Sequence, residues 1–122
     1  MPEAVVDLQL SARAGKACTV VKVGGQLDMA TAPELDRCIR QVADDGGLQV
    51  VLDLADVSFL DSSGLGVLLA WFKELRSAGG RLCVAAVQEI VAYVLQVAAL
   101  DQVMEVYDTV GAAEADMPPL TA

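Results

Sequence analysis

Hydrophobic and polar positions alternate with two different periods along this chain, and the change of period separates strands from helices. Alternation over 5–10 predicts a strand with one solvated face, and the β-branched segment 17–23 predicts a second strand. The segment 12–16, which includes Gly15, is predicted to be a turn, and its shortness indicates that the two strands form an antiparallel hairpin. Two later segments, 48–54 and 81–87, are almost wholly apolar, which is typical of strands covered on both faces of a parallel sheet.

Apolar residues at helical spacing follow these strands. Thr31 and Glu34 have the spacing of a capping box, and Pro33 fits the first turn of a helix that Gly46-Gly47 ends. A second helix is predicted over 63–78. Its predicted core stripe consists of Leu65, Leu68, Leu69, Phe72 and Leu75.

The remaining segments continue the alternation of strands and helices. We predict a helix over 88–99, a short strand over 103–107 and a weak helix from Val110. This order predicts an α/β fold, with helices packed on a mainly parallel central sheet and an antiparallel hairpin at its N-terminal edge. We expect one domain over 1–111 and a frayed tail over 112–122, where Met117 precedes two prolines.

The composition excludes several kinds of chemistry. The chain has 122 residues, no histidine and a formal net charge of -9. Three cysteines, Cys18, Cys38 and Cys83, match neither a zinc site nor a disulfide framework, so we expect no metal and small buried thiols in a reducing cytoplasm. The negative charge opposes binding to nucleic acid or to an anionic membrane. Among the longest apolar runs is 65–72, far short of the ~20 residues of a spanning helix.

The residues that several common enzyme classes require are absent from this sequence. Without histidine there is no serine-histidine-acid triad, and there is no glycine-rich Gly-Lys-Ser/Thr loop for a nucleotide. Asp53 has a position that would suit the phosphoacceptor of a receiver domain. That site also needs a lysine late in the chain, and the last lysine here is Lys73. We therefore expect a binding protein and not an enzyme.

The segment 53–66 carries the most specific signal, because a predicted central strand leads there through a loop into a helix. One interpretation is that Asp61, Ser62 or Ser63 merely caps that helix. The other is that a serine hydroxyl at the carboxyl end of the strand is modified, with Gly64 and Gly66 leaving bare backbone for a partner.

The motif Asp61-Ser62-Ser63-Gly64-Leu65-Gly66, preceded by Val57-Ser58-Phe59-Leu60, resembles the signature of the STAS domain family. Within that family it looks like the anti-sigma-factor antagonists. The segment Gly25-Gln26-Leu27-Asp28, followed by Thr31, is similar to a second motif of the family. The resemblance covers 5–107, although Gln26 stands where glutamate is frequent and 89–100 lacks the basic residues and glycine common there.

This resemblance implies a switch. Such an antagonist binds an anti-sigma factor that is also a serine kinase, and thereby releases a sigma factor. The kinase supplies the ATP, phosphorylates the residue corresponding to Ser62 and dissociates, and a phosphatase resets the serine. The alternative is a STAS scaffold subunit without a switch, in a stress-signalling or lipid-transport assembly.

The resemblance also assigns contacts with the kinase. Asp28 is expected at the kinase contact, and its carboxylate is free if Thr31 caps the following helix. Two further hypotheses concern Trp71: it forms an exposed docking patch with Val67, or it packs under the next helix. The complete set of expected partner-binding residues is Asp28, Asp61, Ser63, Gly64, Gly66, Val67 and Trp71.

Overall fold

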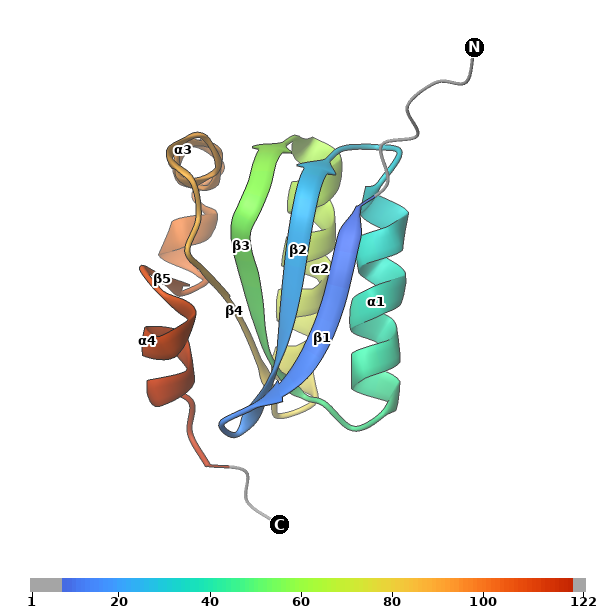
Figure 1. Cartoon of the computed structure of the whole chain (residues 1–122), viewed down its shortest axis with the longest axis vertical. Helices are drawn as coiled ribbons and strands as arrows, with labels where there is room; N and C mark the ends of the chain where they lie inside the picture. Colours follow the sequence, from blue (N-terminus) through green and yellow to red (C-terminus); the bar gives the residue numbers. More distant parts are fainter. Residues whose placement is uncertain (1–7, 120–122) are drawn as a thin grey trace.

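Five strands form one sheet in residues 8–119, the part of the chain that the computed structural model describes (Figure 1). The strands are β1 Gln9–Gly15, β2 Cys18–Leu27, β3 Gln49–Leu60, β4 Arg81–Ala85 and β5 Val106–Tyr107. They lie in chain order across the sheet, with β1 antiparallel to β2 and every later pair parallel. This arrangement confirms the predicted α/β fold and its antiparallel N-terminal hairpin.

The hairpin lies further along the chain than the alternation predicted. β1 begins at Gln9, and the earlier part of the predicted strand, residues 5–7, lies outside the described residues. The predicted turn from residue 12 is wrong, because β1 continues to a two-residue turn, Lys16-Ala17. Ala17 has a φ of 59°, as the second central residue of a tight turn can. β1 is an exposed edge strand, so its hydrophobic pattern marks its bounds poorly.

β2 and β3 both extend beyond their predicted ends. The segment 55–60 was predicted as a loop but forms the second half of β3. Register shifts between Lys22 and Gly24 and between Gly25 and Gln26 interrupt the pairing of β2 with β3. A β-bulge leaves an extra residue unpaired and breaks the alternation, which is why the pattern ended the strand early.

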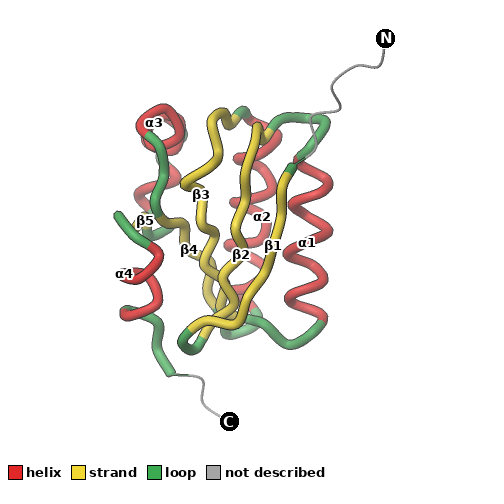
Figure 2. The backbone as a smooth tube through the Cα atoms, in the orientation of Figure 1, coloured by secondary structure: helices red, strands yellow, loops and turns green. Residues whose placement is uncertain are grey.

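Two helices cover one face of the sheet, namely α1 (Ala32–Asp44) and α2 (Ser62–Ser77), which lie side by side in Figures 1 and 2. Of the stripe predicted on α2, Leu68 and Leu75 are buried, but the other three members are only partly buried. Trp71 is buried in their place. This face holds the larger aliphatic core, to which β2, β3 and β4 all contribute.

The C-terminal third of the chain contains α3 (Glu89–Val97), a single 3-10 turn named η1 (Leu100–Gln102) and α4 (Val110–Ala115). η1 was not predicted. The predicted frayed tail is wrong for the described part of the segment from 112 onward, because Ala113 and Met117 are buried. They pack in a second core cluster with Val20, Val51, Cys83 and Ala85. Residues 50 and 51 of β3 belong to different clusters, as expected for neighbours that point to opposite faces of a sheet.

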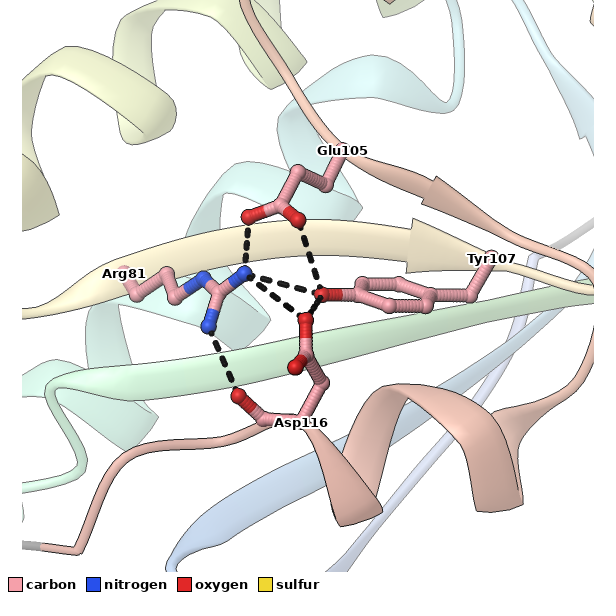
Figure 3. A network of polar contacts seen from close by, with 4 residues as sticks. All are labelled: Arg81, Glu105, Tyr107 and Asp116. Atoms are coloured by element: carbon pink, nitrogen blue, oxygen red, sulfur yellow. Dashed lines mark hydrogen bonds and ion pairs between the residues drawn. The ribbon is translucent and has the colours of Figure 1, made fainter.

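A polar network holds the segment after α4 against the sheet (Figure 3). The Arg81 guanidinium donates to the backbone oxygen of Asp116 at 3.2 Å and to the Tyr107 hydroxyl at 2.8 Å, and it also contacts the Glu105 carboxylate. Burial and hydrogen bonds to the Asp116 and Glu105 carboxylates raise the pKa of Tyr107 above its ordinary value. Its hydroxyl therefore remains a neutral donor, and β4, β5 and the tail are joined at one point.

The three cysteines differ in burial. Cys83 is fully buried, as expected, and burial raises the pKa of its thiol to about 12. Cys18 and Cys38 are half-buried, and burial raises the pKa of each. All three are free thiols.

Candidate functional site

The candidate site lies where β2 and β3 end together. Leu27 pairs with Leu60, so Asp28 and Asp61 are the first residues beyond two neighbouring parallel strands. The backbone N–H of Asp61 donates to the Leu27 oxygen at 3.1 Å, which ties the two exits to each other. This pairing brings the two predicted motifs, which are distant in the chain, to one edge of the sheet, next to the start of α2.

Asp61 is the residue that caps α2. Its Oδ1 accepts hydrogen bonds from the backbone N–H of Ser63 at 2.9 Å and of Gly64 at 3.4 Å. Capping therefore needs neither serine hydroxyl. Ser62 is the first residue of α2 and is exposed, and its hydroxyl has no hydrogen-bond partner among the described residues, whereas Ser63 is half-buried. Of the two serines, Ser62 offers its oxygen more openly to a partner.

The hydrogen bonds of Asp28 and Thr31 differ from the predicted ones. The Thr31 side chain makes no capping hydrogen bond to α1, so the predicted capping box is wrong. Its hydroxyl is buried, donates to the Gln26 oxygen at 2.6 Å and accepts from the Asp28 N–H at 3.0 Å. Asp28 Oδ1 accepts from the N–H groups of Ala30 at 2.9 Å and Thr31 at 3.1 Å. One oxygen of the Asp28 carboxylate, Oδ1, is therefore engaged and orders the loop between β2 and α1.

The two glycines of the motif occupy different surroundings. Gly64 is buried, and a Cβ there would collide with Leu60 Cδ1 and lie 3.0 Å from Leu27 Cβ. Packing against the strand ends thus explains Gly64. Gly66 is exposed, and a Cβ there would meet nothing within 4 Å. Nothing in the fold of this chain requires a glycine at position 66.

The predicted docking patch of Val67 and Trp71 does not form. Trp71 is 4% exposed, and its indole N–H donates to Asp36 Oδ1 at 2.7 Å. The Arg40 guanidinium lies 4.9 Å from the centroid of the Trp71 ring. Val67 is partly buried against the core. Trp71 is therefore a packing residue between α1 and α2. The second hypothesis was right that Trp71 is buried, but the polar contacts of its ring are with α1, the preceding helix, and not with the next one.

Sequence reasoning missed two exposed apolar residues at this end of the sheet. Met29, in the loop after β2, is 80% exposed, and Phe59, near the end of β3, is 43% exposed. Phe59 pairs with Gln26, one residue before the paired ends of the strands. The sequence pattern predicts a loop for the segment that contains Phe59. Only the structure, which places Phe59 in a strand, shows that its ring points away from the core. Both side chains offer apolar surface to a partner near Ser62.

The features of this site suit the binding of a partner. It combines an exposed hydroxyl, two carboxylates engaged with backbone N–H groups, and exposed apolar side chains. Within residues 8–119, no group of three or more carboxylate or cysteine side chains is arranged to hold a metal ion. Over the same residues, no helix combines the length and the apolar character that crossing a membrane requires.

Comparison with known proteins agrees with this geometry. Residues 9–113 match the STAS domain family. An anti-sigma-B factor antagonist of Staphylococcus epidermidis is 35% identical over 86 residues, and that of Staphylococcus aureus is 33% identical; each alignment covers 70% of this chain and 80% of the relative. The crystal structure of an anti-sigma factor antagonist from Mycobacterium paratuberculosis has a TM-score of 0.84 at 29% identity, covering 95% of this chain and 98% of that one.

The sheet order and the family match define the class of domain, and the chain belongs to the STAS domain family. Within that family it is similar to the anti-sigma factor antagonists.

Proposed function

We propose that this protein is an anti-sigma factor antagonist whose binding to a serine kinase is switched off by phosphorylation of Ser62. In the unphosphorylated state it binds the anti-sigma factor through the surface around Ser62 and thereby releases a sigma factor. The kinase supplies the ATP, and a phosphatase restores the hydroxyl. This cycle takes place in the cytoplasm, where ATP and the transcription machinery are found.

The single observation that carries the proposal is the exposed, unbonded hydroxyl of Ser62 at the first position of α2. A kinase must reach the oxygen that it modifies, and Ser62 needs no change of fold to present it. Ser63 is half-buried and its backbone N–H is bound by Asp61. These differences favour Ser62 over Ser63 as the acceptor.

The capping contacts of Asp61 also decide what a phosphate on Ser62 can do. A helix N-terminus usually stabilises a phosphate through its free N–H groups. Here the N–H groups of Ser63 and Gly64 already donate to Asp61. The phosphate would have to displace that carboxylate or remain facing outward, and the repulsion between the two anions favours the outward position.

An outward phosphate is well placed to break a protein complex. It adds about -1.5 to -2 charges beside Asp61. One unit-charge pair at ~4 Å repels by about 4 kcal/mol at an effective dielectric of 20. A single such contact with an acidic group of the kinase would weaken binding by about three orders of magnitude. The switch therefore needs local electrostatics only and no refolding of the antagonist.

The direct test is incubation with the cognate anti-sigma factor and ATP, followed by mass spectrometry of peptides. We expect one added phosphate on Ser62 in the wild type and none in Ser62→Ala. Ser77→Ala is the matched control, since Ser77 is also exposed but ends α2; its labelling should equal that of the wild type. If the factor binds but Ser62 gains no phosphate, the switch is refuted and the scaffold alternative gains support.

Variants of Ser62 separate binding from switching. We expect Ser62→Ala to stay bound to the kinase whether or not ATP is added, because no charge can be introduced at that position. Ser62→Asp should bind at least about tenfold more weakly, since it carries a permanent charge smaller than that of a phosphate. Titration calorimetry without ATP measures both. Equal affinities for Ser62→Asp and wild type would contradict the electrostatic mechanism.

A further inference from the structure

A second exposed apolar surface lies on the C-terminal third of the molecule, away from the residues of the Ser62 site. Its members are Tyr93 and Val97 of α3, Val103 and Val106, with exposed fractions of 63%, 69%, 55% and 39%. Tyr93 and Val97 are four residues apart and so share one face of α3. We call these four residues the α3–β5 surface. Val91 and Leu95 already pack α3 on the core, so the exposed side chains are not needed for that contact.

A pocket of about 410 Å³ opens within this surface between α3, η1 and β5. Tyr93, Ala92, Leu95 and Val106 supply its apolar lining, and Glu89, Gln96 and Asp101 supply the polar groups. Asp101 Oδ1 is shielded from solvent and has no hydrogen-bond partner among the described residues. A shielded carboxylate oxygen without a donor is unfavourable, and a ligand that brings an N–H group would satisfy it.

The charge that lines this pocket has one sign, whereas the basic residues Lys73 and Arg76 of α2 line a separate pocket beside Val103. No lysine or arginine follows Arg81, whereas the acidic residues after it are Glu89, Asp101, Glu105, Asp108, Glu114 and Asp116. Arg81 pairs with Glu105 and Asp116, and Arg13 pairs with Glu114. In the described part of the chain no ion pair involves Glu89 or Asp101, the two carboxylates that line the pocket. At the pocket, the apolar surface is therefore bordered by uncompensated negative charge.

We propose that the α3–β5 surface binds a basic amphipathic helix of a partner protein. The apolar side chains of that helix would cover Tyr93, Val97 and Val106, and one lysine or arginine would enter the pocket and donate to Asp101. A second copy of this chain does not fit, because two acidic pockets would then face each other. Nucleic acid and anionic lipid are excluded by the same repulsion. The proposal is independent of the Ser62 switch, since the two surfaces share no residue.

Nuclear magnetic resonance of the 15N-labelled full chain tests this proposal with a defined probe. The probe is an 18-residue helical peptide with leucines on one face and lysines on the other. The first control peptide keeps the lysines but replaces every leucine by serine; the second keeps the leucines but replaces the lysines by glutamates. We expect saturable shifts at Tyr93, Val97, Asp101 and Val106 with the probe, and none of these shifts with either control.

Two variants locate the interaction. Tyr93→Ser and Asp101→Asn should each lower the affinity for the probe by about tenfold. Asp44→Asn removes the same charge from an exposed position at the end of α1 and should leave the affinity unchanged. The proposal is overturned if the probe does not saturate at millimolar concentration or if its shifts cluster elsewhere. It is also overturned if the serine-containing peptide binds equally, or if Asp44→Asn weakens binding as much as Asp101→Asn.

Discussion

Gly64 and Gly66 are two positions apart in α2, yet the structure explains only the first. At Gly64 the backbone approaches Leu27 and Leu60 so closely that a side chain would have to displace them. Gly66 lies in an exposed part of a helix with open space around it, where glycine costs about 0.5–1 kcal/mol relative to alanine. An unfavourable residue without a role in the fold is explained if the backbone of a partner approaches at that position.

The substitution Gly66→Ala tests this interpretation. We expect it to raise the free energy of unfolding by about 0.5–1 kcal/mol, because alanine is the better helix former. It should at the same time weaken binding of the anti-sigma factor, since the added methyl group would keep the partner away. Denaturant unfolding and titration calorimetry measure the two effects. A more stable protein with unchanged affinity would show that no partner comes close at Gly66.

Gly64→Ala is the matched comparison on the same helix. Here we expect a loss of stability of about 1–3 kcal/mol from overpacking against Leu27 and Leu60. If the two substitutions change the free energy of unfolding in opposite directions, packing requires glycine at position 64 but not at position 66.

At the scale of elements, α1 and α2 are joined by one polar contact within an apolar interface. The Trp71 indole reaches across to Asp36, and Arg40 both stacks on the ring and lies 3.8 Å from the Asp36 carboxylate. This contact fixes how α2 lies against α1 and hence how Ser62, at the N-terminal end of α2, is held. It acts on the site by positioning and touches no partner.

We predict that Asp36→Ala destabilises the protein by about 1–3 kcal/mol, because the nearly buried indole N–H loses its acceptor. Trp71 is the single tryptophan, so its fluorescence reports the unfolding transition directly. Arg40→Ala is the control and should cost less, about 0.5–1 kcal/mol, since the ring contact is at an exposed side chain. Equal stability of Asp36→Ala and wild type would show that the hydrogen bond does not hold the two helices.

For the whole molecule, the decisive feature is that the chain returns after β5 to cover the second face of the sheet. Ala113 and Met117 bury Val20 and Val51, and the Gln49 side chain donates to the Pro118 oxygen at 3.0 Å. Glu114 adds a link to the hairpin through Arg13, whose hydrogen bond lowers the pKa of that carboxyl. The C-terminal segment is thus a structural part of the domain.

A chain that ends at residue 111 should therefore be less stable than the full chain by about 2 kcal/mol or more, since burial of Met117 alone contributes about 1.5–3 kcal/mol. It should also expose Cys83, which burial protects in the full chain, to a thiol reagent at pH 8. A chain that ends at residue 119 keeps every contact described here and is the control. Equal unfolding midpoints and an unreactive Cys83 in the chain ending at 111 would mean that this face does not need its cover.

The pattern of the sequence predicted much of the architecture and part of the site. Apolar runs such as 48–54 and the helical spacing behind Pro33 sufficed for the α/β order, because burial on one or two faces leaves a periodic trace in the sequence. The start of α2 was predicted within one residue of Ser62. The bulges of β2 and β3 could not be predicted, since an inserted residue erases the alternation on which strand prediction depends.

The order of strands and helices and the serine-glycine motif can be read from the sequence, because they depend on neighbours within a few positions. Only the tertiary structure decided which polar groups remain available. Asp28 and Thr31 are engaged with the β2–α1 loop, Asp61 takes the N–H groups of α2, and the Ser62 hydroxyl is left open. The burial of Trp71 and of Met117 likewise depends on segments that are distant in the chain. The physical reason is that burial and hydrogen bonding depend on groups that folding brings together, and local periodicity does not record them.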